Sequence, residues 1–312
     1  MKLSEIVHLK NLTVDPTVYP RFDVFFKTLN EFMYYIYTHS VRVHDIEPDL
    51  SNTVADLKQN VVKFEDKILF FREKLNSAIK ALEPDYYANS KVLYENDMAG
   101  ATNEHVLNRK LAIDDESYEL LKGHLKYYVD WRLPAMILRP GLETFIEDLV
   151  ALDPLYLVDH NQQLLAPAVQ RFTPEYQRRL RTYIVDERLS DNILKDLPDN
   201  QFGLVFAYNY FNFKSIDVIV RYLQEIFEKL RSGGTLVMTY NECDHHHGIE
   251  LFERGFMCYT PGKTIKEHAE KIGFETTFHH SGLADLTWFE FKRPGDIETL
   301  RGGQTLAKVV PK

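Results

Sequence analysis

Three absences narrow the class of this protein. No uninterrupted apolar run approaches the ~20 residues that a helix needs to cross a membrane. Cys243 and Cys258 are the only cysteines, so we expect no disulfide framework and a reducing, cytoplasmic environment. The first residues, Met1–Lys10, mix charged and apolar side chains, which is not the pattern of a signal peptide.

Positive charge is also scarce. The chain has 37 Lys and Arg against 46 Asp and Glu, a formal charge of −9. Because nonspecific affinity for nucleic acid comes mostly from Lys and Arg that neutralise phosphates, this balance argues against a nucleic-acid partner. One arginine cluster is either a local basic patch or, as we favour, a solvated helix face before a strand: Arg171, Arg178, Arg179 and Arg181.

The rest of the chain is organised around residues 134–161. Apolar runs at 135–138 and 155–158 enclose Pro140-Gly141 and a helix-sized segment that reaches Val150. This order predicts a strand, a tight turn, a helix and a strand, the opening unit of a nucleotide-binding α/β sheet. Asp159 closes the second run, where an acid can accept hydrogen bonds from a ribose. The loop carries only one glycine of the set expected there.

The N-terminal part, residues 1–131, is predicted to be helical. Aromatic and apolar residues repeat at steps of three and four over 15–44, and again over a long helix at about 49–83, which Pro84 should end. Such a stripe is typical of a coiled coil or helical hairpin. The long helix therefore packs on the preceding helix or on the same helix of another subunit, giving a homo-oligomer. We favour packing within the chain.

Residues 84–116 are mixed in character and predict a loop or lid with short helices, followed by a helix over 115–131. Strands at 181–185, 203–208 and 235–240 then alternate with helices, so the sheet should be mostly parallel. Two strands at 274–279 and 286–292 are joined by a short turn and should pair antiparallel, unless another strand separates them. A loosely held tail, 294–312, ends the chain.

Three segments resemble class I S-adenosylmethionine-dependent methyltransferases. They are the leucine-proline-acid-phenylalanine lead-in at Leu197–Val205, the leucine-arginine-x-glycine-glycine turn at Leu230–Leu236, and the strand entry at Ala269–Glu275. The resemblance covers about half of the chain, residues 132–293. It implies a Rossmann-like α/β sheet that ends in an antiparallel hairpin, with S-adenosylmethionine as the cofactor.

The same resemblance implies positions for the cofactor. Asp159, with His160, stands where the family binds ribose hydroxyls, and Asp186, with Glu187, where it meets the adenine amino group. The remaining positions follow the first and fourth strands: Arg139, Pro140, Gly141, Glu143, Tyr208 and Asn209.

The first-strand motif departs from the family pattern. The family's acid is Ile137 here, and two of its glycines are Arg139 and Glu143. Arg139 either fills the cofactor space and pairs with Glu143 or Asp159, or points at the cofactor carboxylate as a bidentate donor.

Candidate catalytic bases are Tyr208, His245 and His246. The histidines belong to Asn241–His247, the densest run of ligand-type side chains. Such a run could bind zinc, but adjacent histidines cannot all point one way, so we predict a polar loop and no metal. His279 and His280 should lie at the surface, and Trp288 and Phe289 in the core.

Two functions follow. The leading one is methyl transfer from S-adenosylmethionine to a small-molecule or protein acceptor. Methylation of a nucleic-acid base is not expected, because Asn209 is followed by Tyr210-Phe211 rather than by the proline pair of DNA amino-methyltransferases. The alternative is a methyltransferase-like domain without activity that serves as a structural or assembly component. A fold alone does not separate the two.

Overall fold

The computed structural model describes residues 2–12, 34, 50–99, 114–140, 145–187, 192–281 and 287–297. The chain divides into two compact units, Met1–Asp85 and Tyr86–Lys312.

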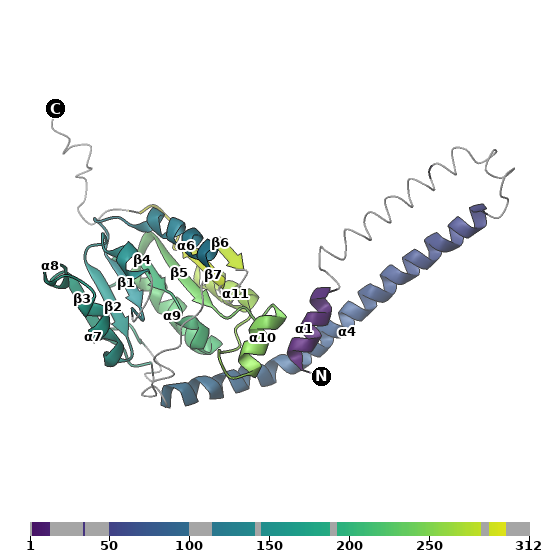
Figure 1. Cartoon of the computed structure of the whole chain (residues 1–312), viewed down its shortest axis with the longest axis horizontal. Coiled ribbons are helices and arrows are strands. Elements are labelled where there is room, and N and C mark those ends of the chain that lie inside the picture. Colours follow the sequence, from purple (N-terminus) through teal and green to yellow (C-terminus); the bar gives the residue numbers. More distant parts are fainter. Residues whose placement is uncertain are drawn as a thin grey trace. The chain divides into compact units, whose positions relative to one another are not determined.

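The first unit contains α1 (Leu3–Leu12) and most of α4 (Leu50–Ala99), both shown in Figure 1. Leu3, Ile6 and Val7 of α1 are buried, as is Leu75 of α4. The helix predicted over 15–44 lies outside the described residues, apart from Tyr34. Whether the long helix pairs with it therefore stays a prediction.

The predicted end of the long helix at Pro84 is wrong. Helix α4 runs for 50 residues and passes through Pro84. A proline inside a helix removes one backbone hydrogen bond and costs about 3 kcal/mol. The residues just beyond it offset that cost, because the rings of Tyr86 and Tyr87 pack on Tyr259 at centroid distances of 5.5 and 5.2 Å. The loop predicted from residue 84 is thus helical as far as Ala99.

The second unit is built on one seven-stranded sheet with the order β3-β2-β1-β4-β5-β7-β6. Strands β1 to β5 are parallel, and β7 pairs antiparallel with both β5 and β6. The predicted mostly parallel sheet with an antiparallel end is confirmed. The strands are β1 (Ala135–Leu138), β2 (Leu155–Asp159), β3 (Leu180–Ile184), β4 (Phe202–Ala207), β5 (Leu230–Tyr240), β6 (Glu275–Ser281) and β7 (Thr287–Lys292).

Helices cover both faces of this sheet, so the unit has three layers (Figure 1). One face packs against α9 (Ile216–Lys229) and α11 (Gly262–Ile272). The other packs against α6 (Asp115–Tyr128), α7 (Gln162–Gln170) and the short α8 (Pro174–Gln177). The central strands β1, β2 and β4 are almost continuous apolar runs, because the middle of a parallel sheet is buried on both faces. The predicted core positions of Trp288 and Phe289, 0% and 2% exposed, are confirmed.

Two local predictions are corrected. After β1 the described residues form only a short 3-10 turn, η1 (Ile146–Leu149), in place of the predicted helix. After β5 the predicted polar loop contains α10 (His246–Glu253). Its apolar Ile249 is fully buried, which explains why so polar a sequence becomes helical there.

Among the helices that the structure describes, none combines the length and the apolar character needed to cross a membrane.

Candidate functional site

The candidate site lies where the strand order reverses. From β1 the sheet continues through β2 to β3 on one side and through β4 to β5 on the other. In open α/β sheets, ligands bind outside the carboxyl ends of the strands at such a switch point. The residues that follow β1, β2, β3 and β4 therefore form the site.

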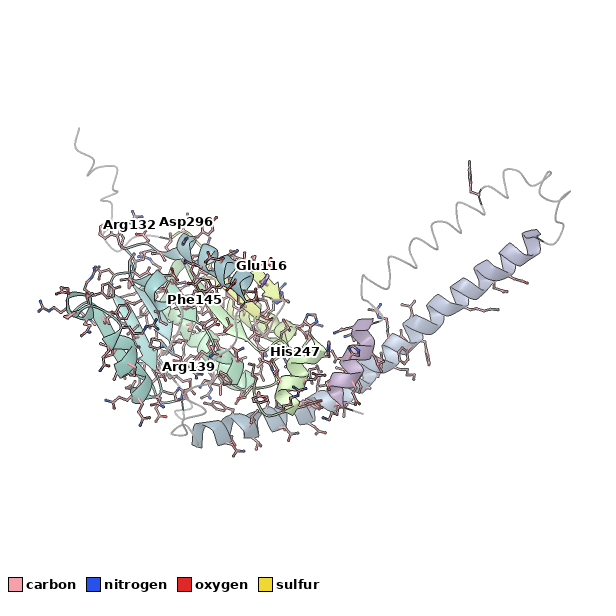
Figure 2. The ribbon with its side chains drawn as sticks, viewed as in Figure 1. Glu116, Arg132, Arg139, Phe145, His247 and Asp296 are labelled. Carbon is pink, nitrogen blue, oxygen red and sulfur yellow. The ribbon has the colours of Figure 1, made fainter. Side chains whose placement is uncertain are left out.

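Arg139 follows β1 and bridges to the end of β4. Its Nη1 donates a hydrogen bond to the backbone oxygen of Asn209 at 3.1 Å, and the guanidinium lies 5.3 Å from the ring centroid of Phe213. Arg139 and Asn209 have φ values of 54° and 52°, a left-handed conformation that glycine adopts at little cost. Arg139, labelled in Figure 2, thus has the backbone conformation expected of a glycine but adds a cation at the end of β1.

Asp159, at the end of β2, is fully buried. Its Oδ1 accepts a hydrogen bond from the backbone N–H of Asn161 at 2.8 Å, whereas Oδ2 has no partner among the described residues. Burial raises the pKa of Asp159 to about 6. A buried acceptor without a donor is costly to the fold, and it is the kind of group that a bound hydroxyl would satisfy.

His160 stands beside this carboxylate. Its Nδ1 lies 3.4 Å from Asp159 Oδ1 and 3.9 Å from Glu187 Oε1. Burial, with the nearby charge of Lys214, lowers the pKa of His160 to about 4. The imidazole is therefore neutral at pH 7 and adds no charge to the site.

Glu187, after β3, accepts hydrogen bonds from four side chains. Its Oε2 accepts from Lys214 Nζ at 2.6 Å and from the Tyr94 hydroxyl at 2.9 Å. Its Oε1 accepts from the hydroxyls of Tyr210 and Tyr222. Burial opposes ionisation of Glu187, but the charge of Lys214 and these hydrogen bonds hold its pKa low, at about 2. The Glu187 carboxylate, predicted to meet the adenine amino group of the cofactor, therefore already accepts hydrogen bonds from four of the protein's own side chains.

The other predicted positions differ in how exposed they are. Asp186 is exposed, unlike its neighbour Glu187, and Pro140 is buried. Tyr208 is buried in the core, its ring 5.1 Å from that of Phe145. Gly141 and Glu143 lie outside the described residues.

The predicted bases His245 and His246 lie at the start of α10, beyond the end of β5. His245 is exposed and His246 is half-buried. Within the described part of the chain, no three His, Cys, Asp or Glu side chains are grouped as a metal site would require.

A polar cluster surrounds Glu242, which belongs to the polar run Asn241–His247. The Tyr240 hydroxyl donates to Glu242 Oε2 and lies 2.9 Å from His279 Nε2, which is itself 3.3 Å from Glu242 Oε2. The backbone N–H of Gly262 also donates to Glu242, at 3.2 Å. His279, predicted to be a surface residue, is 41% exposed but tied to this buried carboxylate. Tyr240 is a sequence neighbour of Glu242, but Gly262 and His279 lie 20 and 37 positions away, so no local pattern could have predicted the whole cluster.

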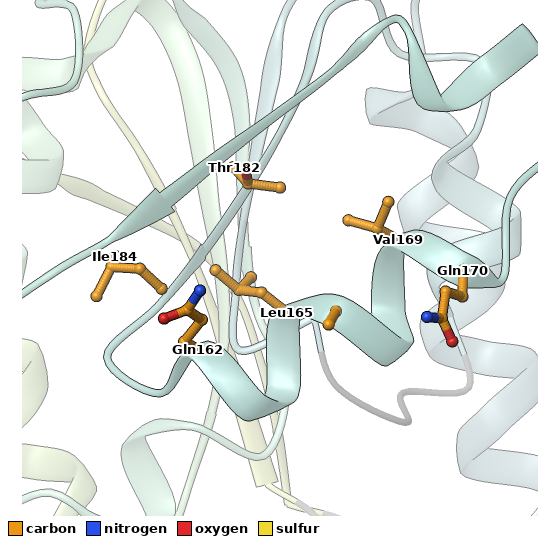
Figure 3. Close-up of a pocket in the computed structure, with 7 residues that line it drawn as sticks. Gln162, Leu165, Val169, Gln170, Thr182 and Ile184 are labelled. Atoms are coloured by element: carbon orange, nitrogen blue, oxygen red, sulfur yellow. The ribbon is translucent and has the colours of Figure 1, made fainter. Parts of the chain in front are cut away.

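A cavity of about 360 Å³ lies elsewhere, between α7 and β3 (Figure 3). Its walls include Leu165, Val169 and Ile184, with Gln162 and Gln170 also lining it. None of Arg139, Asp159 or Glu187 lines it, so we do not assign the site to it.

The sheet decides the fold. The resemblance predicts a mostly parallel sheet that ends in an antiparallel hairpin, and the structure has both, with β7 between β5 and β6. The second unit has the class I methyltransferase fold. No protein-family model matches the sequence. No curated protein matches it either.

Solved methyltransferase structures are similar to the chain. An S-adenosylmethionine-dependent methyltransferase from Mesorhizobium loti is 11% identical, with a TM-score of 0.44, over 55% of this chain and 96% of that one. The N-methyltransferase NodS from Bradyrhizobium japonicum is 12% identical, with a TM-score of 0.43, over 58% and 99%. Geranyl diphosphate C-methyltransferase from Streptomyces coelicolor is 6% identical, with a TM-score of 0.45, over 57% and 81%. At such identities the similarity concerns the fold and not the activity.

Proposed function

We propose that the methyltransferase-fold domain binds S-adenosylmethionine at Asp159 and transfers its methyl group to a small-molecule or protein acceptor. The observation that carries the proposal is the buried Asp159 Oδ2, which has no partner among the described residues. It lies at the switch point of the sheet, where a ribose hydroxyl could donate to it. The residues at this end of the site fit the cofactor.

The protein's contribution to such a reaction is mainly positioning. Asp159 would hold the ribose hydroxyls, and the Arg139 guanidinium would pair with the carboxylate of the cofactor's amino-acid part. When bound, the cofactor supplies the methyl group from its sulfonium. The other proposed cofactor contacts are Pro140, Gly141, Glu143, His160, Asp186, Glu187, Tyr208 and Asn209.

An acceptor that carries a proton also needs a base. His245 and His246 are accessible enough for this role, whereas Tyr208 is 3% exposed. We therefore prefer a histidine of α10 over Tyr208 as the proposed base. The acidic balance of the chain, −9, supports an acceptor other than nucleic acid.

A second function is favoured by a specific observation. The Arg139–Asn209 hydrogen bond crosses the switch point, and Glu187 has its oxygens engaged by Lys214 and three tyrosines. A domain whose site is filled in this way could act without cofactor, as a structural or assembly component. Pairing of the long helix α4 with a second copy would then supply the contact.

Isothermal titration of the full chain with S-adenosylmethionine and S-adenosylhomocysteine distinguishes the two. The enzyme proposal expects saturable binding that Asp159→Ala weakens by a factor of ten or more, since a hydrogen bond to a charged group is worth about 1.5–3 kcal/mol. Asp148→Asn is the matched control, because Asp148 makes only a half-exposed ion pair with Lys122. Absence of binding at millimolar ligand would leave the assembly function.

A further inference from the structure

The part of α4 beyond Pro84 is attached along one side to the segment that follows β5. Each contact joins a polar side chain of α4 to α10, to α11 or to the connection between them. The contacts are Tyr86 Oη to Glu253 Oε1 at 2.6 Å, Tyr87 Oη to Thr264 Oγ1 at 3.2 Å, and the Tyr259 backbone N–H to Ser90 Oγ at 2.9 Å.

The other end of the same stretch is bound near β3, the strand at one edge of the sheet. Tyr94 donates to Glu187, which follows β3. The stretch Tyr86–Tyr94, called the strap below, therefore joins groups after β5 to a group after β3. Strands β4, β1 and β2 lie between them in the sheet, so the strap spans the edge where their carboxyl ends meet.

The hydrogen bond from Tyr94 is easier to break than the contact of Lys214 with the same oxygen of Glu187. Lys214 Nζ is a cation 2.6 Å from the same oxygen, and removing a cation from a buried carboxylate costs far more than removing a neutral hydroxyl. Tyr210 and Tyr222 would still hold the other oxygen. Release of Tyr94 therefore leaves Glu187 ionised and still paired with Lys214. Its Oε2 can then accept a hydrogen bond from another donor.

We propose that the strap is a gate over the ligand site, held shut by Tyr94 on Glu187, and that Tyr94 determines which ligand enters. This rests on the proposed function, since the entering ligand is then an adenosyl compound. The amino group of its base replaces the Tyr94 hydroxyl as the donor to Glu187 Oε2. A ligand without a donor at that position cannot take the place of Tyr94 and is selected against.

Opening of the strap can be measured without any ligand, because it covers a thiol. Cys258 is fully buried, with its Sγ 3.8 Å from the backbone oxygen of Ser90, one turn before Tyr94. In a Cys243→Ala background, Tyr94→Phe should raise the labelling rate of Cys258 by a thiol reagent about tenfold. Cys243, 2% exposed and measured in a Cys258→Ala background, is the control and should keep its rate. No increase at Cys258, or an equal increase at both cysteines, would overturn the gate.

The ligand step is tested separately with S-adenosylhomocysteine. Tyr94→Phe should raise its association rate about tenfold, because less of the protein is closed. The exposed Tyr127→Phe, at 87% exposure, should leave that rate unchanged. If neither the wild type nor Tyr94→Phe binds the compound, the proposed function fails, and the thiol rates alone decide the gate. If both bind at the same rate, the proposed function stands and the gate is wrong.

Discussion

The side chain of Arg139 spans two neighbouring strands of the sheet and donates a hydrogen bond to the backbone oxygen of Asn209, 3.1 Å away. Both residues have a positive φ. A position that expects glycine has thus kept its backbone conformation while gaining a cation, and the two effects can be separated by mutation.

Arg139→Gly and Arg139→Ala should differ in stability. Both variants lose the guanidinium and its hydrogen bond, but only alanine keeps a Cβ in the left-handed region, at a cost of roughly 1 kcal/mol. The glycine variant should therefore be the more stable by about that amount. Urea unfolding of the two proteins measures the difference. Equal midpoints would mean that the φ of 54° is not maintained in solution.

Asp159 should make stability fall as the pH rises. Burial raises its pKa to about 6 in the folded protein, so the fold binds a proton that the unfolded chain has already lost. The contribution of Asp159 to stability is then greatest below pH ~4 and declines up to pH ~6, by up to about 3 kcal/mol. Asp159→Asn removes this loss because an amide does not ionise, and its Oδ1 can still accept the hydrogen bond from the Asn161 N–H.

The comparison is made by urea unfolding at pH 4 and pH 7. The wild type and Asp159→Asn should have similar stability at pH 4, and the variant should be the more stable at pH 7. Asp148→Asn, at a half-exposed ion pair, should show no such divergence. A wild type that equals Asp159→Asn at pH 7 would contradict the burial of this charge.

Lys214→Met should be among the most damaging single substitutions in the described residues. It leaves Glu187, 2% exposed, as a buried charge without its cation, and breaking such a pair typically costs about 3–5 kcal/mol. Adding Glu187→Gln removes the isolated charge, so the double variant should recover part of the loss. A double variant that is less stable than Lys214→Met would show that the pair is not coupled in this way.

The same pair sets an acid limit. Burial works against ionised Glu187, yet Lys214 and the tyrosines lower its pKa to about 2 in the folded state. Its contribution to stability is therefore present above the ordinary glutamate pKa and is lost as the pH falls toward 2. The Lys214→Met,Glu187→Gln protein should lack this part of the acid transition, which circular dichroism can follow.

Two glycines in helices should respond oppositely to alanine. At Gly262 an added Cβ would lie 2.4 Å from the Tyr240 hydroxyl and 2.9 Å from the Glu242 carboxylate oxygens, so Gly262→Ala should destabilise by about 1–3 kcal/mol. At Gly123, in α6, nothing lies within 4 Å, and alanine should stabilise by roughly 0.5–1 kcal/mol. Thermal unfolding of both variants checks the packing around Glu242. A neutral Gly262→Ala would show that this cluster is loosely packed.

The sheet was predictable from the sequence because its central strands β1, β2 and β4 are buried along their whole length and almost entirely apolar. Runs such as 135–138 and 155–158 are buried on both faces, and their order with the intervening helices leaves few alternatives for the topology. The antiparallel pairing of β6 with β7 followed from the short connection between them. Both signals lie within short stretches of sequence, and they were enough to predict the arrangement of the sheet.

The errors have non-local causes. Pro84 was expected to end α4, but the helix continues through it. Tyr86 and Tyr87, just after Pro84, pack on Tyr259, which lies 175 positions after Pro84 in the sequence. Glu187 was predicted to meet the adenine amino group of the cofactor, but it accepts hydrogen bonds from four side chains at positions 94, 210, 214 and 222. No window of sequence contains such a set, so the saturation of Glu187 could not be anticipated.

The partnerless oxygen of Asp159 has a consequence for the heat of binding. A ligand that donates hydrogen bonds to Oδ2 stabilises the ionised carboxylate and lowers its pKa from about 6. Near that pH, binding must then expel part of a proton into the buffer. The calorimetric enthalpy of the wild type should accordingly change with the ionisation enthalpy of the buffer, whereas that of Asp159→Asn should not.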